Sequence, residues 1–269
     1  NHACALCVEK GLQIEVPERA QYIRVILDEL TRLASHELWW GAMAMDLGAF
    51  TPFFHAFRER ETINDIMEET CGARLTMNYM VPGGVMHDIH PNFQKNVKAF
   101  ITKFRKKLPE YDKLLTDNII FQNRTKGIGI LSKEDAIAYG VTGPTGRASG
   151  FSCDVRKHHP YSAYPYIKFE EKMGTEGDSF TRWKLRMDEM WESMNIIEQL
   201  IDNIPEGDFA VKMKGVIKLP EGEFYQRVES ARGEFGVYIV SDGKKNPYRV
   251  KFRSPGFSNL FTINHIAKG

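Results

Sequence analysis

The sequence contains few cysteines, almost no net charge and no long apolar run. Its 269 residues include four cysteines, and Cys4-x-x-Cys7 has the spacing of a metal or redox pair. A second such pair, which a four-thiolate site requires, does not occur, so we expect Cys4 and Cys7 to pack in the core. Unpaired cysteines are typical of a reducing compartment. The formal net charge of +1 gives no electrostatic reason to expect nucleic-acid binding. No apolar segment approaches the roughly 20 residues of a membrane-spanning helix.

Nucleotide-binding motifs are also missing. The glycine-rich segment from Gly140 to Gly150 invites comparison with a phosphate-binding loop, but Val141 stands where that motif needs glycine, and Arg147-Ala148 replaces its lysine and hydroxyl residue. A tight loop around a buried arginine fits the segment better. The chain also lacks a dinucleotide-binding fingerprint and ligands for an iron–sulfur cluster, so we expect it to bind neither NADH nor iron by itself.

Helical periodicity dominates the first three quarters of the chain. Apolar residues form a stripe in residues 17–46, where Ile23, Ile26, Leu30, Leu33 and Leu38 recur at intervals of three to five. Ser132 with Asp135 resembles a capping box, and Asp178 is placed to cap a long helix. The predicted helices are residues 1–11, 17–46, 52–70, 92–116 with a break at Pro109, 132–140 and 179–203, and residues 77–90 are predicted to form a loop.

The last quarter has the alternating pattern of strands. Residues 223–229, 235–241 and 247–253 are rich in Val, Tyr, Phe and Ile, and Asp242-Gly243 lies between the second and the third. We therefore predict a mainly α or α+β fold, packed as one domain. Its parts are a helical-bundle core at 1–204, with an irregular region at 141–177 that holds one strand near 164–170, and an antiparallel β region with a short C-terminal helix at 205–269.

Residues 46–61, DLGAFTPFFHAFRERE, are the most informative stretch. Asp46 ends a long apolar helix, Gly48 allows a turn, and Thr51-Pro52 is expected to start the next helix, with Thr51 as N-cap and Pro52 at the first helical position. A carboxylate at a helix C-terminus opposes the helix dipole, which indicates a tertiary reason for its presence. An ionisable group where two helices meet suits proton transfer, and the alternative is a solvent-exposed acid.

The same stretch resembles a signature of the D subunit of proton-translocating NADH:quinone oxidoreductase, respiratory complex I. Further blocks agree in order along the chain: IEVPERAQYIRVILDELTRL at 14–33, GARLTMNYMVPGGV at 72–85, RASGFSCDVRK at 147–157, ESARGEFGVYIVSDG at 229–243 and PYRVKFRSPGF at 247–257. Residues 229–234 also resemble a segment of nickel–iron hydrogenase large subunits, so the resemblance implies the fold of those subunits.

The resemblance implies a quinone site. Asp46 would be its catalytic residue, paired with a histidine from an upstream segment near the quinone headgroup. Leu38, Ala42, Thr76 and Val81 would line the quinone cavity or lie near an iron–sulfur cluster. The chain itself would bind no cofactor and no metal, because the quinone would bind at an interface and the cluster would belong to the neighbouring small iron–sulfur subunit.

Two of these positions depart from the family. Many relatives carry a histidine where this chain has Thr76 and an arginine where it has Val81. A positive or protonatable neighbour stabilises a reduced cluster, so its absence should lower the reduction potential of the cluster. We therefore expect a low-potential cluster that serves a low-potential acceptor such as menaquinone, and the alternative is neutral drift.

The resemblance also implies partners and a place in the cell. The chain would form the quinone cavity of complex I with the small iron–sulfur subunit, meet other peripheral-arm subunits, and couple electron transfer to proton translocation. It would lie peripherally on the cytoplasmic side of a bacterial cell membrane. The two direct quinone ligands of the family belong to a segment before Asn1, and the chain does not start with Met. We therefore expect a fragment that lacks the N-terminal region and the C-terminal tail, is inactive alone and self-associates.

A charged cluster follows the glycine-rich segment. Arg147, Asp154 and Arg156 are flanked by small and aromatic residues, which favours burial and pairing over a solvated loop. Arg232, in the segment Glu229-Ser-Ala-Arg-Gly-Glu234, is expected to behave in the same way. The resemblance gives these four residues structural or interface roles.

Two other functions are compatible with parts of the pattern. A hydrogenase large subunit would need a Cys-x-x-Cys pair near each end, and no cysteine follows Cys153. A non-catalytic scaffold is the other alternative. His87-x-x-His90 has metal-like spacing without a third ligand in reach, so we expect no metal there. The three tyrosines of residues 161–166 fit either an aromatic interface or a loop core.

Overall fold

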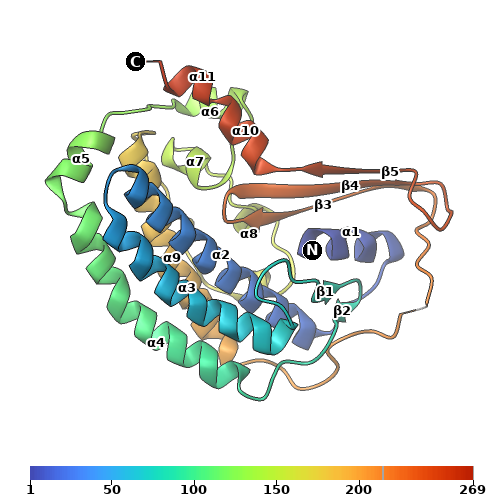
Figure 1. Ribbon diagram of the computed structural model, residues 1–269. Coiled ribbons are helices and arrows are strands. Elements are labelled where there is room, and N and C mark those ends of the chain that lie inside the picture. The colour runs from blue at the N-terminus through green and yellow to red at the C-terminus, as the bar shows by residue number, and fades with distance from the viewer. Residues whose placement is uncertain (214, 269) are drawn as a thin grey trace.

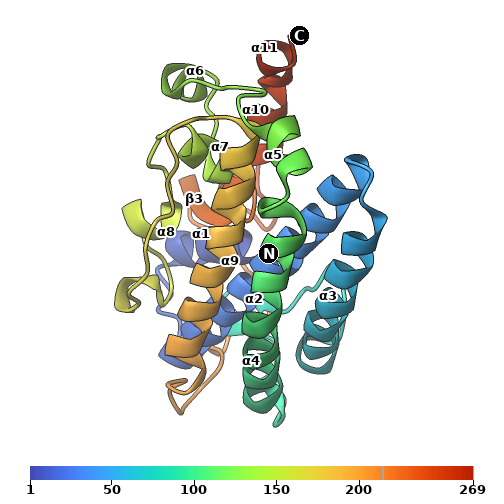
Figure 2. The same ribbon diagram turned by 90° about the vertical axis from the view of Figure 1, so that its left-hand side faces the viewer.

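Long helices pack around α2 in the computed structural model, which describes residues 1–213 and 215–268. α2 (Glu18–Asp46) contacts α3 (Phe50–Cys71) on one side and α9 (Ser179–Ile201) on the other, and α4 (Phe93–Tyr111) packs against both α3 and α9 (Figures 1 and 2). The periodic residues of α2 explain this arrangement, because Ile23, Ile26, Leu30 and Leu33 are all fully buried. Within the described residues, no helix combines the length and the apolarity needed to cross a bilayer.

Short elements complete the helical part. Two of them are turns, one of π type and one of 3₁₀ type, and the rest are short α-helices. The helices are α1 (His2–Leu12), α5 (Ile119–Thr125), α6 (Lys133–Ala138), α7 (Gly143–Ala148), α8 (Val155–His158), α10 (Pro255–Phe261) and α11 (Ile263–Ile266), and the turns are η1 (Asp112–Thr116) and η2 (Tyr164–Tyr166).

A three-stranded antiparallel sheet follows the helices in the order β3-β4-β5. Its strands are β3 (Gly222–Ser230), β4 (Gly233–Ser241) and β5 (Arg249–Arg253), close to the predicted ranges. α1 packs on this sheet, so the two ends of the chain share one core (Figure 1). The buried thiol of Cys7 donates to the carbonyl oxygen of Val237 over 3.6 Å, and Cys4 packs against the same core. The predicted fold class and the predicted core position of Cys4 and Cys7 are confirmed.

A second, very small sheet lies where the sequence predicts a loop. β1 (Met80–Val81) and β2 (Gly84–Val85) form an antiparallel hairpin. The Arg24 guanidinium donates to the carbonyl oxygens of Val81 and Gly84 over 2.7 and 2.8 Å, which fixes the hairpin against α2. The hairpin is therefore positioned by a buried cation, which is a tertiary interaction that local turn residues do not reveal.

Two local predictions are wrong. The predicted strand near 164–170 is the turn η2, because the amide of Tyr166 donates back to the carbonyl oxygen of Ala163 and the side chain of Tyr164 is turned into the core. The predicted break at Pro109 does not occur either, since α4 continues to Tyr111. The missing amide of a proline removes one helical hydrogen bond, and packing of the buried residues Leu108 and Tyr111 keeps the helix continuous.

The helix caps and the glycine-rich segment follow local chemistry more closely. Ser132 accepts from the amide of Asp135, and Asp178 accepts from the amide of Thr181, as predicted. The segment around Gly143 forms the short helix α7 in place of the expected loop. Gly143 has a φ of +70°, and a Cβ atom there would lie 2.3 Å from the Cα atom of Gly233, so two glycines allow α7 to touch the sheet.

Candidate functional site

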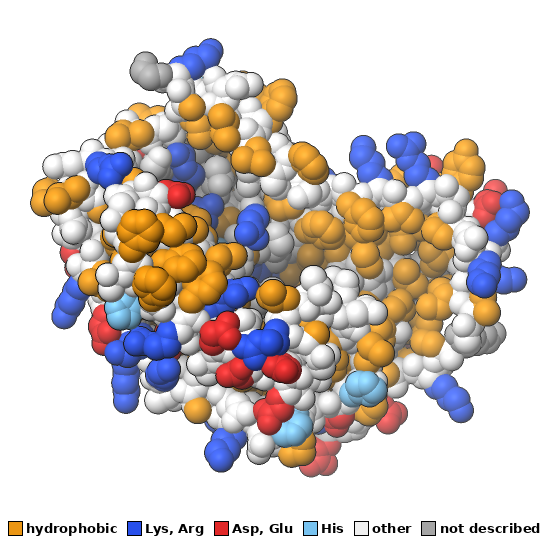
Figure 3. Space-filling view, viewed as in Figure 1, with side chains coloured by type: hydrophobic (Ala, Val, Ile, Leu, Met, Phe, Trp, Pro, Cys, Tyr) orange, Lys and Arg blue, Asp and Glu red, His pale blue; other side chains and the backbone are white. Residues whose placement is uncertain are grey.

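One line of side chains on α2 faces the surface. Thr31 and Asp46 are exposed, and Leu38 and Ala42 are partly exposed. These residues are seven, four and four positions apart, which in an α-helix keeps them on one side. We call these four residues the α2 stripe. The structure thus brings Leu38, Ala42 and Asp46 together on one side of α2. The space-filling view shows that the molecule is hollowed between the helices and the sheet (Figure 3).

The corner between α2 and α3 is built by backbone hydrogen bonds. The amides of Gly48 and Ala49 donate to the carbonyl oxygens of Met45 and Ala44, and Gly48 has a φ of +92°. α3 begins at Phe50, so the predicted N-cap role of Thr51 is wrong, and its side chain makes no cap hydrogen bond. Pro52 lies within the first turn of the helix, where its missing amide costs no helical hydrogen bond.

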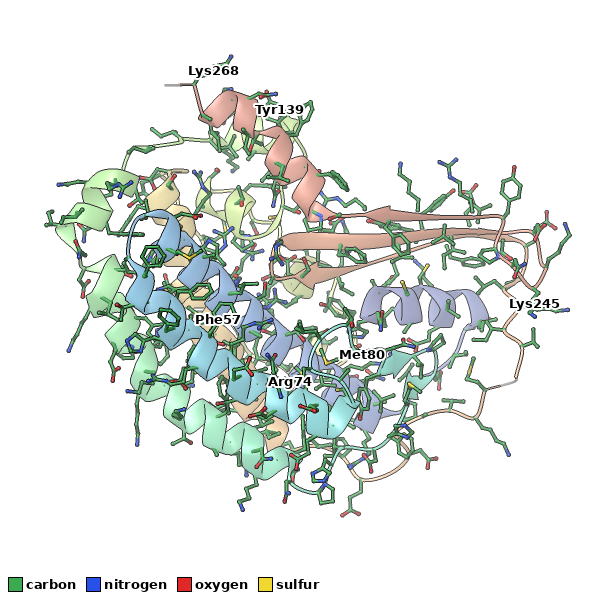
Figure 4. The ribbon with its side chains drawn as sticks, viewed as in Figure 1. Phe57, Arg74, Met80, Tyr139, Lys245 and Lys268 are labelled. Carbon is green, nitrogen blue, oxygen red and sulfur yellow. The ribbon has the colours of Figure 1, made fainter. Side chains whose placement is uncertain are left out.

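Asp46 points to solvent at this corner. It makes no hydrogen bond or ion pair with any residue that the structure describes, and it is exposed. An aromatic ridge, formed by Phe50, Phe53, Phe54 and Phe57 of α3, begins four residues further along the chain. Figure 4 labels Phe57 on this helix.

The aromatic ridge is an unusual surface for an isolated chain. Phe50 and Phe54 are 63% and 69% exposed, and the rings of Phe53 and Phe57 stack with centroids 4.2 Å apart. Hydrophobic side chains gather on the helical half of the molecule in Figure 3. Contiguous apolar patches of this kind mark interaction surfaces, so the acid of Asp46 borders a face that another molecule could cover.

A cavity of about 340 Å³ lies at the other end of the α2 stripe. α1, α2, the segment before β1 and the turn between β3 and β4 form its walls. Most of its lining is apolar, including Leu27, Met77, Met80 and Phe235, and Thr31 of the stripe borders it. An apolar cavity with a few polar groups is the usual form of a small-molecule site.

Thr76 and Val81 flank this cavity and lie far from Asp46. Thr76 is exposed and Val81 is half-buried, and their neighbours Met77 and Met80 line the cavity. Asp46 precedes α3 and Thr76 follows it, so a helix of 22 residues separates them, which corresponds to about 33 Å at 1.5 Å per residue. The α2 stripe connects the two regions.

The polar wall of the cavity is held by short contacts. His2 Nδ1 lies 2.6 Å from Asp28 Oδ2, and His2 Nε2 lies 3.0 Å from Ser162 Oγ. Arg32 donates through Nε to Glu29 and through Nη2 to the carbonyl oxygen of Glu229 over 2.7 Å. These contacts fix the polar groups before any ligand binds, which is what a binding site requires.

A buried ion network lies behind the cavity. Arg147 of α7 contacts Glu189 of α9 and lies 2.9 Å from Glu229 of β3. Arg156 of α8 lies 2.7 Å from Asp154 and 2.9 Å from Glu29 of α2. The predicted burial and pairing of Arg147, Asp154 and Arg156 are therefore present. Their acidic partners were not predicted, although acids inside the apolar stripes of 18–46 and 179–201 are a signal of buried pairing.

The network divides its acids into two kinds. Burial opposes ionisation of Glu189, but Arg147 and His36 outweigh it and hold the pKa of Glu189 well below its usual range. Burial raises the pKa of Glu229 to about 7, with Asp154 adding to the shift and Arg147 opposing it. Glu229 also lines the cavity, so one acid near neutrality lies beside it.

Arg232 is neither buried nor ion-paired, so this prediction is wrong within the residues that the structure describes. It occupies the two-residue turn between β3 and β4, and its side chain is exposed and forms no ion pair with any described residue. Nη1 donates to Ser35 Oγ over 3.2 Å, which places the guanidinium beside the α2 stripe. The side chain is exposed because a tight turn at the edge of the fold offers no core to bury it.

Metal-binding groups do not gather in the part of the chain that the structure describes. Burial raises the pKa of the Cys7 thiol to about 11, so this sulfur stays protonated and is a poor metal ligand. His90 lies 3.1 Å from Glu69, and His87 is exposed. Tyr161 and Tyr164 are buried and Tyr166 is exposed, so the first two belong to the loop core.

Comparison with known proteins gives one consistent family. The family described as "Respiratory-chain NADH dehydrogenase, 49 Kd subunit" matches residues 46–269. The C/D subunit of the NADH-quinone oxidoreductase of Bacteroides thetaiotaomicron is 55% identical over 268 residues, which is 100% of this chain and 51% of that protein. The D 2 subunit of the Opitutus terrae enzyme is 49% identical over 100% of this chain and 67% of that protein, and the D subunit of the Bacillus cereus enzyme is 46% identical over 100% of this chain and 74% of that protein.

The chain spans about half the length of the Bacteroides relative that it matches. The match nevertheless covers 100% of this chain. The match to one family model over residues 46–269, together with relatives of 46–55% identity, shows that this chain belongs to the family of the 49 kDa subunit of the respiratory-chain NADH dehydrogenase.

Proposed function

We propose that this chain forms one wall of the quinone cavity of an NADH:quinone oxidoreductase, and that Asp46 supplies charge or protons at one end of it. The α2 stripe carries this proposal, because it is an open line of small, apolar and acidic side chains beside an apolar ridge. The names of the relatives, which are C/D and D subunits of NADH-quinone oxidoreductase, support the same reaction.

The shape of this face suits a long apolar substrate with a polar head. Thr31 to Asp46 is 15 residues of helix, or about 23 Å. The stripe begins at the cavity and ends at an exposed carboxylate, with Leu38 and Ala42 between them. An isoprenoid chain would pack on the apolar part of the stripe, and a carboxylate can accept or donate the protons that quinone reduction consumes.

A partner protein would complete the cavity. The exposed rings of Phe50 and Phe54 border the stripe and offer an apolar docking surface. The proposed neighbour is the small iron–sulfur subunit, which would supply the cluster, and other peripheral-arm subunits would bring electrons from NADH. The assembly would lie on the cytoplasmic side of a bacterial membrane and couple electron transfer to proton translocation.

The acceptor is proposed to be menaquinone. Thr76 and Val81 carry no charge and flank the cavity at the end opposite Asp46. Without a positive side chain there, a reduced cluster nearby gains less electrostatic stabilisation, so its potential should be low. A redox titration of the cluster in the assembled complex tests this, and a high, pH-dependent potential would contradict it.

The decisive experiment replaces Asp46 in the intact complex. Asp46→Asn should lower quinone reductase activity by about 10²-fold or more, the usual effect of losing a proton-transfer group. NADH oxidation with an artificial acceptor should stay unchanged. Asp65→Asn is the matched control, because Asp65 is an exposed acid on α3 that pairs with Arg74. Equal loss of both activities in Asp46→Asn would count against the proposal.

Two other functions fit the structure less well. A hydrogenase centre needs four thiolates, and the buried, protonated thiol of Cys7 contacts backbone carbonyl groups of the sheet. A scaffold without catalytic function would leave the α2 stripe without a role, and in that case Asp46→Asn would have no effect on either activity.

A further inference from the structure

Two acids are buried between α2, α3 and α4. Glu37 of α2 and Glu59 of α3 are both 0% exposed, and neither belongs to the ion network behind the cavity. Buried carboxyl groups are costly unless they are paired or neutral. The two acids differ in their contacts.

Two cations lie against the carboxyl group of Glu59. Arg58 Nε donates to its Oε1 over 2.8 Å, and Lys103 Nζ of α4 lies 2.8 Å from its Oε2, within ion-pair distance but outside hydrogen-bond geometry. Arg58 and Lys103 are both half-exposed, so they connect Glu59 to the surface groove between α3 and α4, which Lys103 also lines.

Glu37 lacks such partners. Neither of its carboxyl oxygens is hydrogen-bonded by any residue that the structure describes, and Trp40 Nε1, one turn further along α2, is equally unpartnered among those residues. The titratable and charged groups that face Glu37 are Glu59 and Arg60 on α3 and Lys103 and Tyr111 on α4. Burial raises the pKa of Glu37 well above its usual range, the charge of Glu59 raises it further, and Arg60 and Lys103 oppose the shift.

We propose that Glu37 is a proton-binding site inside the helical core, whose buried and unpartnered carboxyl group holds its proton at neutral pH. When the site ionises, the proton leaves a carboxyl oxygen of Glu37 for water, and the carboxyl group becomes a carboxylate. The negative charge of Glu59 opposes this loss, and the positive charges of Arg60 and Lys103 favour it. This inference is independent of the proposed quinone site, since it concerns groups on the buried side of α2.

Infrared spectroscopy of the folded chain tests the site directly. A protonated carboxyl group has its own C=O stretching band, and measurement at pH 8 leaves Glu229, whose pKa is about 7, mainly ionised. The wild-type band should disappear in Glu37→Gln and remain in Glu18→Gln, which changes an exposed acid on the same helix. A wild-type protein without the band, or a band that survives in Glu37→Gln, would overturn the proposal.

Two further variants test the control by neighbouring charges. Glu59→Gln removes the adjacent negative charge and should shift the titration of the Glu37 band to lower pH. Lys103→Met removes a positive charge and should shift it to higher pH. If both variants leave the titration of the Glu37 band unchanged, the charges of Glu59 and Lys103 do not control the protonation of Glu37. These variants keep Glu37 in place, so they remain informative even if Glu37→Gln folds poorly.

Stability measurements provide an independent readout. A carboxyl group with a raised pKa binds more protons in the folded state, so its contribution to stability falls as the pH rises above the ordinary value of 4.5. Glu37→Gln cannot ionise, so its stability relative to wild type should increase steadily between pH 5 and pH 8. Glu37→Leu should show the same trend without any polar group. A difference in the free energy of unfolding that stays constant between pH 5 and pH 8 would contradict a proton bound to Glu37.

Discussion

Arg147 Nη1 lies 2.9 Å from Glu229 Oε1, and both side chains are fully buried although 82 residues separate them in the chain. Arg147 also contacts Glu189 of α9. One guanidinium therefore joins α7, β3 and α9, and it connects the helical part to the sheet. The same network supports the polar wall of the cavity, because Glu229 belongs to both.

Removing Arg147 should destabilise the fold strongly. Arg147→Met would leave Glu189 and Glu229 buried without their cation, which typically costs about 3–5 kcal/mol. Arg74→Met is the matched control, because Arg74 pairs with Glu61, Asp65 and Glu68 on the surface, and its loss should lower the free energy of unfolding far less. Urea unfolding of both variants measures the difference, and similar values for the two would refute the structural role of Arg147.

The stability of the protein should depend on Glu29 in a pH-dependent way. Burial opposes its ionisation, but Arg32, Arg156, Ser193 and Tyr164 outweigh it, so its pKa falls from 4.5 to about 2. A lowered pKa contributes stability above the unfolded-state value, and this contribution is lost as the pH falls from 4.5 toward 2.

Glu29→Gln should accordingly lower the free energy of unfolding by about 3–5 kcal/mol at pH 7. The difference in the free energy of unfolding between Glu29→Gln and wild type should become smaller as the pH decreases below 4.5. Denaturant unfolding at a series of pH values measures it. A constant difference at all pH values would show that the charge of Glu29 is not the source of its contribution.

A Cβ atom at position 48 should destabilise the corner between α2 and α3. Gly48 has a φ of +92°, and a Cβ atom added there would meet no other atom within 4 Å, so the cost of Gly48→Ala would be conformational and not steric. We expect Gly48→Ala to lower the free energy of unfolding by about 1–2 kcal/mol. Gly256→Ala, in helix α10 without a positive φ, should instead stabilise by up to about 1 kcal/mol. Thermal unfolding distinguishes the two signs.

The aromatic ridge should matter for assembly more than for folding. Phe50→Ser with Phe54→Ser removes two largely exposed rings, so the midpoint of thermal unfolding should change little. Co-purification with the iron–sulfur subunit that we propose as its partner should decrease, because apolar anchors dominate protein interfaces. Tyr248→Ser is the control, since Tyr248 is 77% exposed and lies on the connection before β5. Unchanged assembly of the double variant would exclude the ridge as a docking surface.

Local sequence patterns predicted most of the elements. The stripe of Ile23, Ile26, Leu30 and Leu33 predicted the buried side of α2, and Ser132 and Asp178 predicted their helix starts. The prediction of a strand near 164–170 was wrong because tertiary packing of Tyr164 overrides the strand propensity of this segment. The prediction of Thr51 as the N-cap was wrong because the backbone hydrogen bonds after Asp46 allow α3 to begin earlier, at Phe50.

The candidate site was only partly visible in the sequence. Spacing of four residues is enough to place Leu38, Ala42 and Asp46 on one side of a helix, whatever packs against it. The cavity depends on residues from both ends of the chain, such as His2 and Phe235, and no local pattern brings them together.

The sequence by itself determined the long helices, the three strands of the C-terminal sheet, the corner at Asp46 and the family, because periodicity, turn residues and motif spacing are properties of short segments. The tertiary structure decided which charges are buried. Glu229, Glu29 and Glu37 are chemically identical acids, and their pKa values differ in magnitude and direction. Desolvation and the distance to the nearest guanidinium or ammonium group set those differences, and both arise only when segments far apart in the chain pack together.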